Sequence, residues 1–268
     1  MLTPRRIYRG VRRRVFGSLD LRRKIESIGA TVSSTKGPGV ARFDGLEVGY
    51  PDPLVFYMEL KDIWKHRIYH FESDTGSPRI LDCGSHIGMS VLYFKHAYPQ
   101  SSITAFEPDP QICAILAANL ERNDIRDVEV VNAALFSKEG DVSFAPDVRD
   151  AGRVVQPGEG EITVRGMRLD PFLKEPVDFL KMNIEGMETD VIRDSASRLR
   201  QINQMVIEYH GEAERPQDLH ELLALLDQSG FRYLIHDFDE QSVAATKPPF
   251  RMDSKTRFVL LVYARRWD

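Results

Sequence analysis

The stretch Arg79–Gly88 reads RILDCGSHIG, and it decides the fold. Its first five residues predict a short apolar strand. A turn punctuated by glycine follows, and then an apolar helix near Met89–Ala97. A strand, a glycine turn and a helix in this order are typical of the place where an α/β sheet binds a nucleotide-like ligand.

The segments that follow alternate between apolar strands and helical patterns. Strands are predicted at Ser102–Phe106, Val128–Val131, Val177–Ile184, Gln204–Tyr209, Phe231–Ile235 and Phe258–Tyr263, and helices at Asp109–Arg122, Glu188–Leu199 and Pro216–Gln228. This alternation predicts a Rossmann-like, doubly wound parallel sheet with helices on both faces. Because a loop without a helix joins the final two strands, the last strand is expected to be antiparallel. We therefore expect a seven-stranded α/β domain over residues 76–268.

The first 75 residues show no comparable pattern. We interpret residues 1–75 as a basic leader followed by an N-terminal extension that caps the site or packs on the sheet. A short strand is expected at Arg42–Val48, and helical patches within Pro53–Phe71. Further along the chain, Asp141–Phe144 and Glu161–Val164 predict the strands of an insertion into the main domain.

Charge is spread unevenly along the chain. Residues 1–24 carry nine Arg and Lys and one Asp, a net charge of +8, which leaves −12 on the rest. An acidic body argues against a nucleic-acid partner. Two interpretations of the leader stay open: an amphipathic anchor that contacts an anionic membrane surface, and a solvated helix whose charges keep it soluble.

The composition also indicates the cellular compartment in which the protein is expected. No apolar run approaches the ~18–20 residues that span a bilayer, and the N-terminus lacks the apolar core of a secretory signal. The two cysteines, Cys83 and Cys113, make a disulfide framework impossible and fit a reducing compartment. We expect a cytoplasmic protein, with the inner membrane surface as the alternative if the leader is an anchor. The sequence indicates no oligomeric state.

The glycine turn has the features of a cofactor-binding loop. Gly84 allows the backbone to approach a ligand closely, and Gly88 allows the next helix to pack near the strand. Asp82, at the strand end, suits the charged amino-acid portion of a ligand. His86 stands where a dinucleotide fingerprint needs its second glycine, which disfavours a nicotinamide cofactor. The alternative is that the turn is only structural.

The next two strand ends also carry polar groups. Glu107 ends the second strand 25 residues after Asp82, about where an acid binds ribose hydroxyls, and Pro108 then redirects the chain. Asn132 follows the third strand, where it is a candidate either for adenine binding or for capping a loop. An acid at a strand end is weak evidence for a cofactor site by itself, but together with the glycine turn it becomes strong evidence.

The fourth and fifth strands bring candidate catalytic groups to the same edge. Lys181, Asn183 and Glu185 recur at every second position, on a strand that should be nearly all apolar. Burying such groups is costly unless they are paired or functional, and a Lys181–Glu185 ion pair is the structural alternative. His210 follows the fifth strand. It is a candidate general base because it titrates near neutrality, and a capping role is its alternative.

We expect no metal site. One set of side chains is in a position to converge around a divalent cation if the strand ends meet closely: Glu185, Glu188, Glu208 and His210.

Together these motifs resemble the FkbM family of methyltransferases. That family typically shows D-x-G-A-N-x-G, then F-E-P, then K-I-D-x-E-G-x-E, and this chain has Asp82–Gly88, Phe106–Pro108 and Lys181–Glu188 in the same order. The resemblance covers residues 79–211. It implies a class I methyltransferase fold, S-adenosyl-L-methionine as the cofactor, and O-methylation of a hydroxyl on a sugar, polysaccharide or secondary metabolite.

The resemblance also indicates which residues form the site. The expected cofactor-binding residues are Asp82, Gly84, Ser85, His86, Gly88, Glu107, Pro108 and Asn132, and the expected catalytic residues are His210, Glu185, Asn183 and Lys181.

Two positions depart from the family pattern. His86 replaces the usual Asn, and both residue types tolerate left-handed turns, so cofactor binding is expected to survive. Asn183 replaces an Asp that in the family lies beside the reacting methyl, which moves our hypothesis for the base to His210. The rival hypotheses are a binding module that has lost its chemistry and a nicotinamide-dependent oxidoreductase.

Overall fold

The computed structural model describes residues 19–32, 34–146, 152–155, 162–237, 253–254 and 256–267. Residues 1–18, which hold most of the basic leader, lie outside this set, so neither interpretation of the leader is tested. Within the described ranges no helix has the length and apolar character needed to cross a membrane.

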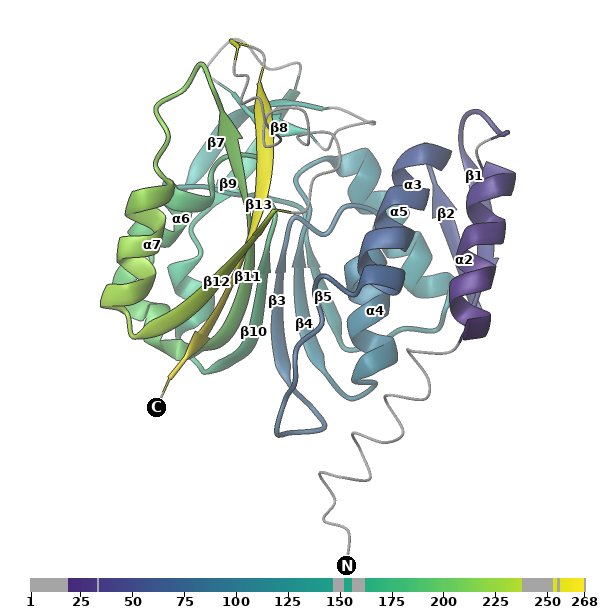
Figure 1. Ribbon diagram of the computed structural model, residues 1–268, viewed down its shortest axis with the longest axis horizontal. Coiled ribbons are helices and arrows are strands. Elements are labelled where there is room, and N and C mark those ends of the chain that lie inside the picture. The colour runs from purple at the N-terminus through teal and green to yellow at the C-terminus, as the bar shows by residue number, and fades with distance from the viewer. Residues whose placement is uncertain are drawn as a thin grey trace, which may run out of the picture.

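A seven-stranded sheet forms the centre of the protein, in the order β12-β13-β11-β10-β3-β4-β5 (Figure 1). The strands are β3 (Arg79–Cys83), β4 (Ser102–Phe106), β5 (Val128–Val131), β10 (Val177–Met182), β11 (Ile202–Glu212), β12 (Phe231–Asp237) and β13 (Arg257–Arg266). Neighbouring strands from β5 to β11 are parallel, whereas β13 lies between β11 and β12 and is antiparallel to both. The predicted doubly wound sheet with a reversed last strand is confirmed.

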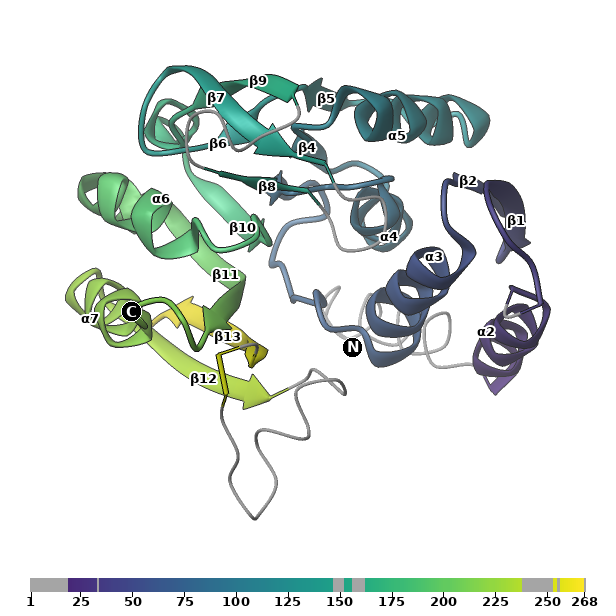
Figure 2. The same cartoon turned by 90° about the horizontal axis from the view of Figure 1, so that it is seen from above.

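Helices cover both faces of the sheet (Figure 2). The helices α4 (Met89–Ala97) and α5 (Pro110–Arg122) lie on one face, and α6 (Glu188–Asp194) and α7 (Leu219–Gln228) lie on the other. Alternate strand residues contribute to two separate cores: Ile80 and Phe179 to the first, Leu81 and Leu180 to the second. This double burial explains why the central strands read as almost continuous apolar runs.

The N-terminal extension packs on the face that carries α4. It consists of α2 (Leu19–Val32), β1 (Gly39–Phe43), β2 (Leu46–Tyr50), α3 (Pro53–Glu59) and the π-helical segment η1 (Leu60–His66). Phe71 stacks on Phe179 of β10 at 4.1 Å between ring centroids, and Trp64 makes an edge contact with Tyr93 of α4 at 5.4 Å. Its apolar side chains therefore belong to the same core as α4.

The single strand predicted at Arg42–Val48 is wrong, because this region is the hairpin β1–β2. Asp44 and Gly45 make the turn with positive φ angles of 49° and 83°. An Asp-Gly pair between two short strands favours such a turn, because both of its central residues need positive φ.

Several predicted boundaries also shift. The fourth strand ends at Met182, and the helix that follows it ends at Asp194, after which the chain continues as the 3-10 helix η3 (Ala196–Gln201). The predicted insertion is a separate sheet in the order β6-β9-β7-β8, formed by β6 (Ala134–Leu135), β7 (Gly140–Ala145), β8 (Arg153–Val154) and β9 (Ile162–Met167). The 3-10 helix η2 (Asp170–Leu173) leads from it to β10.

One buried side chain ties the hairpin to the glycine turn. Asn119 of α5 is fully buried, and its Oδ1 accepts a hydrogen bond from the Gly49 backbone N–H at 2.7 Å. Its Nδ2 donates to the carbonyls of Gly49 and Ile87, both at 2.9 Å. This amide therefore joins the extension, α5 and the segment between β3 and α4.

Replacing Asn119 by alanine should destabilise the protein. The change removes the acceptor of the Gly49 N–H and one donor to each of two carbonyls, and an unpaired buried group costs ~1–3 kcal/mol. We expect Asn119→Ala to lower the free energy of unfolding by ~2–4 kcal/mol in urea titrations. The exposed Arg126→Ala is the control and should change it by less than ~0.5 kcal/mol. Equal effects of the two substitutions would contradict this interpretation.

Candidate functional site

The glycine turn after β3 lies close against the backbone that follows β10. Gly84 has a φ of 81°, and a Cβ at this position would lie 1.8 Å from the backbone oxygen of Asn183. The backbone N–H groups of Gly84 and Ser85 both donate to the carbonyl of Phe106, at 3.0 and 2.8 Å. The turn therefore links β3 to the ends of β4 and β10, and no residue with a side chain fits at Gly84.

The other residues of the turn each have a conformation or a contact that suits the turn. Ser85 is buried, and its Oγ donates to the carbonyl of Asp82 at 2.9 Å. His86 has a φ of 47°, the left-handed conformation that Asn and His both tolerate. Gly88, with a φ of 91°, precedes the first turn of α4 and packs against Leu116.

Beneath the turn lies a buried ion pair. Asp82 and Lys181 are 0% and 3% exposed, and Lys181 Nζ lies 3.4 Å from Asp82 Oδ1. Lys181 also donates to the carbonyl of Gly84 and lies over the Tyr69 ring, 5.3 Å from its centroid. Burial raises the pKa of Asp82 even though Lys181 opposes the shift. Lys181 is therefore paired with Asp82 and not, as the structural alternative had it, with Glu185.

Backbone N–H groups hold the carboxylate of Glu107, the acid that follows β4, in place. Glu107 is buried and accepts hydrogen bonds from the N–H groups of His86 at 2.8 Å and Asp109 at 2.9 Å. Burial raises the pKa of Glu107 to about 7. Asn132 donates from Nδ2 to the carbonyls of Glu107 and Pro108, at 2.8 and 2.9 Å, which are the contacts expected of a loop cap.

A second buried carboxylate, Glu208, lies at the end of β11. It accepts a hydrogen bond from the Tyr69 hydroxyl and another from Asn183 Nδ2 at 3.0 Å. Burial raises the pKa of Glu208 above its ordinary value. The Oδ1 atom of Asn183 is buried without a hydrogen-bond partner, so a polar acceptor remains open at this point of the site.

His210 lies between two further carboxylates. Its Nδ1 is 3.0 Å from Glu188 Oε1, and its Nε2 is 3.5 Å from Glu185 Oε2. Burial disfavours the charged imidazole, but the neighbouring carboxylates outweigh it and raise the pKa of His210 to about 10. At neutral pH the ring is therefore an imidazolium, which weighs against its predicted role as a base. That role stays a prediction.

The acidic residues around His210 contact its ring. Across the part of the chain that the structure describes, no three His, Cys, Asp or Glu side chains are arranged to hold a metal ion. The His210 ring instead lies against both Glu185 and Glu188.

Two residues of the site come from the N-terminal extension and escaped the sequence analysis. Tyr69 reaches Glu208, and Glu59 Oε1 lies 2.8 Å from His86 Nδ1. Both occur in the aromatic-rich segment Pro53–Phe71, which belongs to no motif. Its density of aromatic residues close before the glycine turn is the one signal that could have drawn attention to it.

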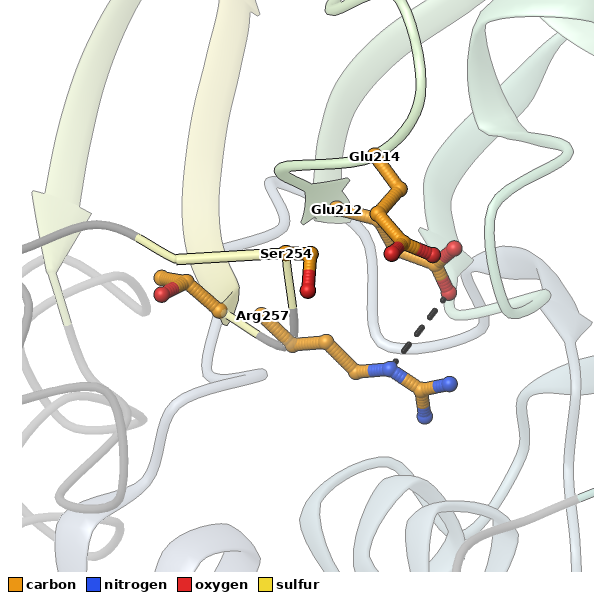
Figure 3. A pocket seen from close by; sticks show the side chains of 5 residues that line it. Glu212, Glu214, Ser254 and Arg257 are labelled. Atoms are coloured by element: carbon orange, nitrogen blue, oxygen red, sulfur yellow. Dashed lines mark ion pairs between the residues drawn. The ribbon is translucent and has the colours of Figure 1, made fainter.

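A cavity of about 430 Å³ lies at the end of β11 (Figure 3). It is lined by Glu212, Glu214, Ser254, Thr256 and Arg257. The carboxylate of Glu212 lies 3.6 Å from Arg257 Nε, and Arg153 and Arg215 pair with the same carboxylate at 3.1 and 2.9 Å. Because alternate strand residues share a side, Glu212 follows Glu208 and His210 on one side of β11.

Comparison with known proteins agrees with these motifs. The sequence model of the Methyltransferase FkbM domain matches residues 82–233. Methyltransferase sdnD of Sordaria araneosa is 27% identical over 211 residues, which cover 64% of this chain and 80% of that protein. The 2-O-methyltransferase NoeI of Sinorhizobium fredii is 27% identical over 177 residues, covering 56% of this chain and 70% of that protein.

A further relative is the hexuronic acid methyltransferase AglP of Haloferax volcanii. It is 25% identical over 179 residues, which cover 62% of this chain and 73% of that protein. The domain match spans more than half of the chain and contains the glycine turn, Glu107 and the polar ends of β10 and β11. The chain therefore belongs to the FkbM family of S-adenosyl-L-methionine-dependent methyltransferases.

Proposed function

We propose that this protein transfers the methyl group of S-adenosyl-L-methionine to a hydroxyl group of a sugar or of another hydroxyl-bearing small molecule. The observation that carries the proposal is the cluster of buried polar groups at the carboxyl ends of β10 and β11, directly beside the glycine turn. The names of two relatives support the acceptor class, because one is a 2-O-methyltransferase and the other acts on a hexuronic acid.

The turn fits the cofactor that the family uses. Gly84 keeps the path along the backbone free of a side chain, and buried Glu107 has carboxylate oxygens with lone pairs to spare for ribose hydroxyls. When bound, the cofactor supplies an electrophilic methyl group. The residues of this chain then have to align an acceptor oxygen with it, and alignment alone can lower a reaction barrier substantially.

The cavity at the end of β11 suits a polyhydroxyl acceptor. Glu212 and Glu214 offer oxygens that accept hydrogen bonds, Arg257 offers donors, and the Ser254 and Thr256 hydroxyls do both. Its volume of about 430 Å³ falls within the range of small-molecule sites. A sugar bound there would lie next to the polar side of β11 that carries His210.

Glu208 is the better placed of two candidate bases. The acceptor hydroxyl must lose its proton, and a base needs a free lone pair for it. The His210 imidazolium has none at neutral pH, whereas each oxygen of Glu208 accepts one hydrogen bond and retains another lone pair. We propose that Glu208 takes the proton and that His210 holds Glu185 and Glu188 in place.

The methyl-transfer activity can be tested directly. We expect the purified chain with S-adenosyl-L-methionine to form S-adenosylhomocysteine and an O-methylated product with at least one member of a panel of neutral sugars, uronic acids and their oligomers, measured by mass spectrometry. Arg257→Ala should raise the acceptor KM at least severalfold and leave cofactor affinity unchanged. Arg232→Ala, an exposed arginine on β12, is the control. Cofactor binding without transfer to any acceptor would favour the binding-module hypothesis.

The pH dependence of the rate separates the two bases. A base works when it is deprotonated, so kcat/KM rises with pH until the pKa of that base is passed. If Glu208 is the base, kcat/KM should level off well below pH 10, and His210→Gln should keep the shape of the profile. A rise that continues towards pH 10 and is abolished in His210→Gln would instead establish His210 as the base.

A further inference from the structure

Two side chains beside the cofactor turn form a hydrogen-bonded pair with unused polar atoms. Glu59 Oε1 and His86 Nδ1 lie 2.8 Å apart. The other atom of each group, Glu59 Oε2 and His86 Nε2, is buried and has no hydrogen-bond partner. A buried polar atom without a partner is costly, so two in one contact call for a ligand or ordered water.

The pair includes one residue of the cofactor turn. His86 is the third residue of the turn that begins at Gly84, and its backbone N–H binds Glu107. Glu59 is the last residue of α3, where the helix changes into the π-helical segment η1. Such π-helical turns occur often at functional sites, where they bring a side chain to a position that a regular helix would miss.

The carboxylate of Glu59 favours the protonated form of the His86 ring beside it. Burial disfavours the charged imidazole, but the Glu59 and Glu107 carboxylates outweigh it and raise the pKa of His86. When the ring is protonated, the pair offers one N–H donor at His86 Nε2 and one acceptor at Glu59 Oε2, side by side. A zwitterion is the ligand that matches both, because its carboxylate accepts from an imidazolium and its ammonium group donates to a carboxylate.

Asp82, which the sequence suggested as the partner of the amino-acid end of the ligand, is less accessible than this pair. Asp82 is fully buried, its Oδ2 accepts from Ser90, and its Oδ1 has no hydrogen-bond partner but lies 3.4 Å from the ammonium group of Lys181. The side chains of His86 and Glu59, in contrast, keep 12% and 22% of their surface exposed. The terminal torsion of a glutamate side chain is broad, so the free oxygen of Glu59 can turn towards a ligand at small cost.

We infer that Glu59 and His86 bind the zwitterionic amino-acid end of S-adenosyl-L-methionine, with His86 receiving the carboxylate and Glu59 the ammonium group. The inference rests on the proposed function, since it concerns the same cofactor. It assigns a part of the cofactor site to the N-terminal extension, outside the matched residues 82–233.

The test compares two ligands that differ only at this end. S-adenosylhomocysteine carries the amino-acid group, and 5′-methylthioadenosine keeps the adenosine and the thioether without it. By calorimetry, Glu59→Gln and His86→Ala should each weaken S-adenosylhomocysteine binding at least tenfold and change 5′-methylthioadenosine binding less than twofold. Glu26→Gln is the matched control, because Glu26 is an exposed acid of the same extension that pairs with Lys65.

The other outcomes contradict the inference in different ways. Unchanged affinity for S-adenosylhomocysteine in both variants would show that the pair does not contact the amino-acid end. Equal losses for both ligands would show that Glu59 and His86 only hold the turn in shape. If the unaltered protein bound neither ligand, the proposed function itself would fall, which distinguishes that failure from the first two.

Discussion

The site depends on the buried ion pair between Asp82 and Lys181. Taking two charges out of water costs several kcal/mol for each ion, and the attraction between them offsets this only where further contacts satisfy both groups. Ser90 donates to Asp82, while Lys181 donates to the Gly84 carbonyl and lies over the Tyr69 ring. The contacts that make this burial tolerable are therefore the ones that fix the glycine turn between β3 and β10.

The same requirement explains the pattern of charges beyond the pair. Each buried acid faces a donor: Asp82 faces Lys181, Glu208 faces Tyr69 and Asn183, and Glu188 faces His210. Asn183 departs from the aspartate of the family pattern, and a carboxylate in its place would point at Glu208. Two carboxylates at that distance cannot both ionise freely, whereas the amide donates a hydrogen bond at 3.0 Å. The departure is therefore consistent with a working site built around Glu208.

The central sheet and the glycine turn could be predicted because their signals are local. Apolar strands, helices of ordinary length and Gly84 with Gly88 all lie within short windows of sequence. The hairpin was missed because Asp44-Gly45 divides a stretch too short to show two periodic patterns. The protonation of His210 could not be predicted from its position, because it depends on Glu185 and Glu188, which the chain brings close by a left-handed turn with a φ of 57° at Glu185.

Glu59 and Tyr69 show where sequence motifs reach their limit. Their partners lie 27 and 139 residues away, and no periodicity or spacing relates such positions. Both reach the site because the aromatic side chains of the extension pack against α4 and β10. This apolar packing places Glu59 beside His86 and Tyr69 beside Glu208. The family motif can therefore fix the sheet and the cofactor turn, while the environment of Glu208 and His86 also depends on a segment that the motif does not describe. An account of this enzyme's chemistry has to include the extension for that reason.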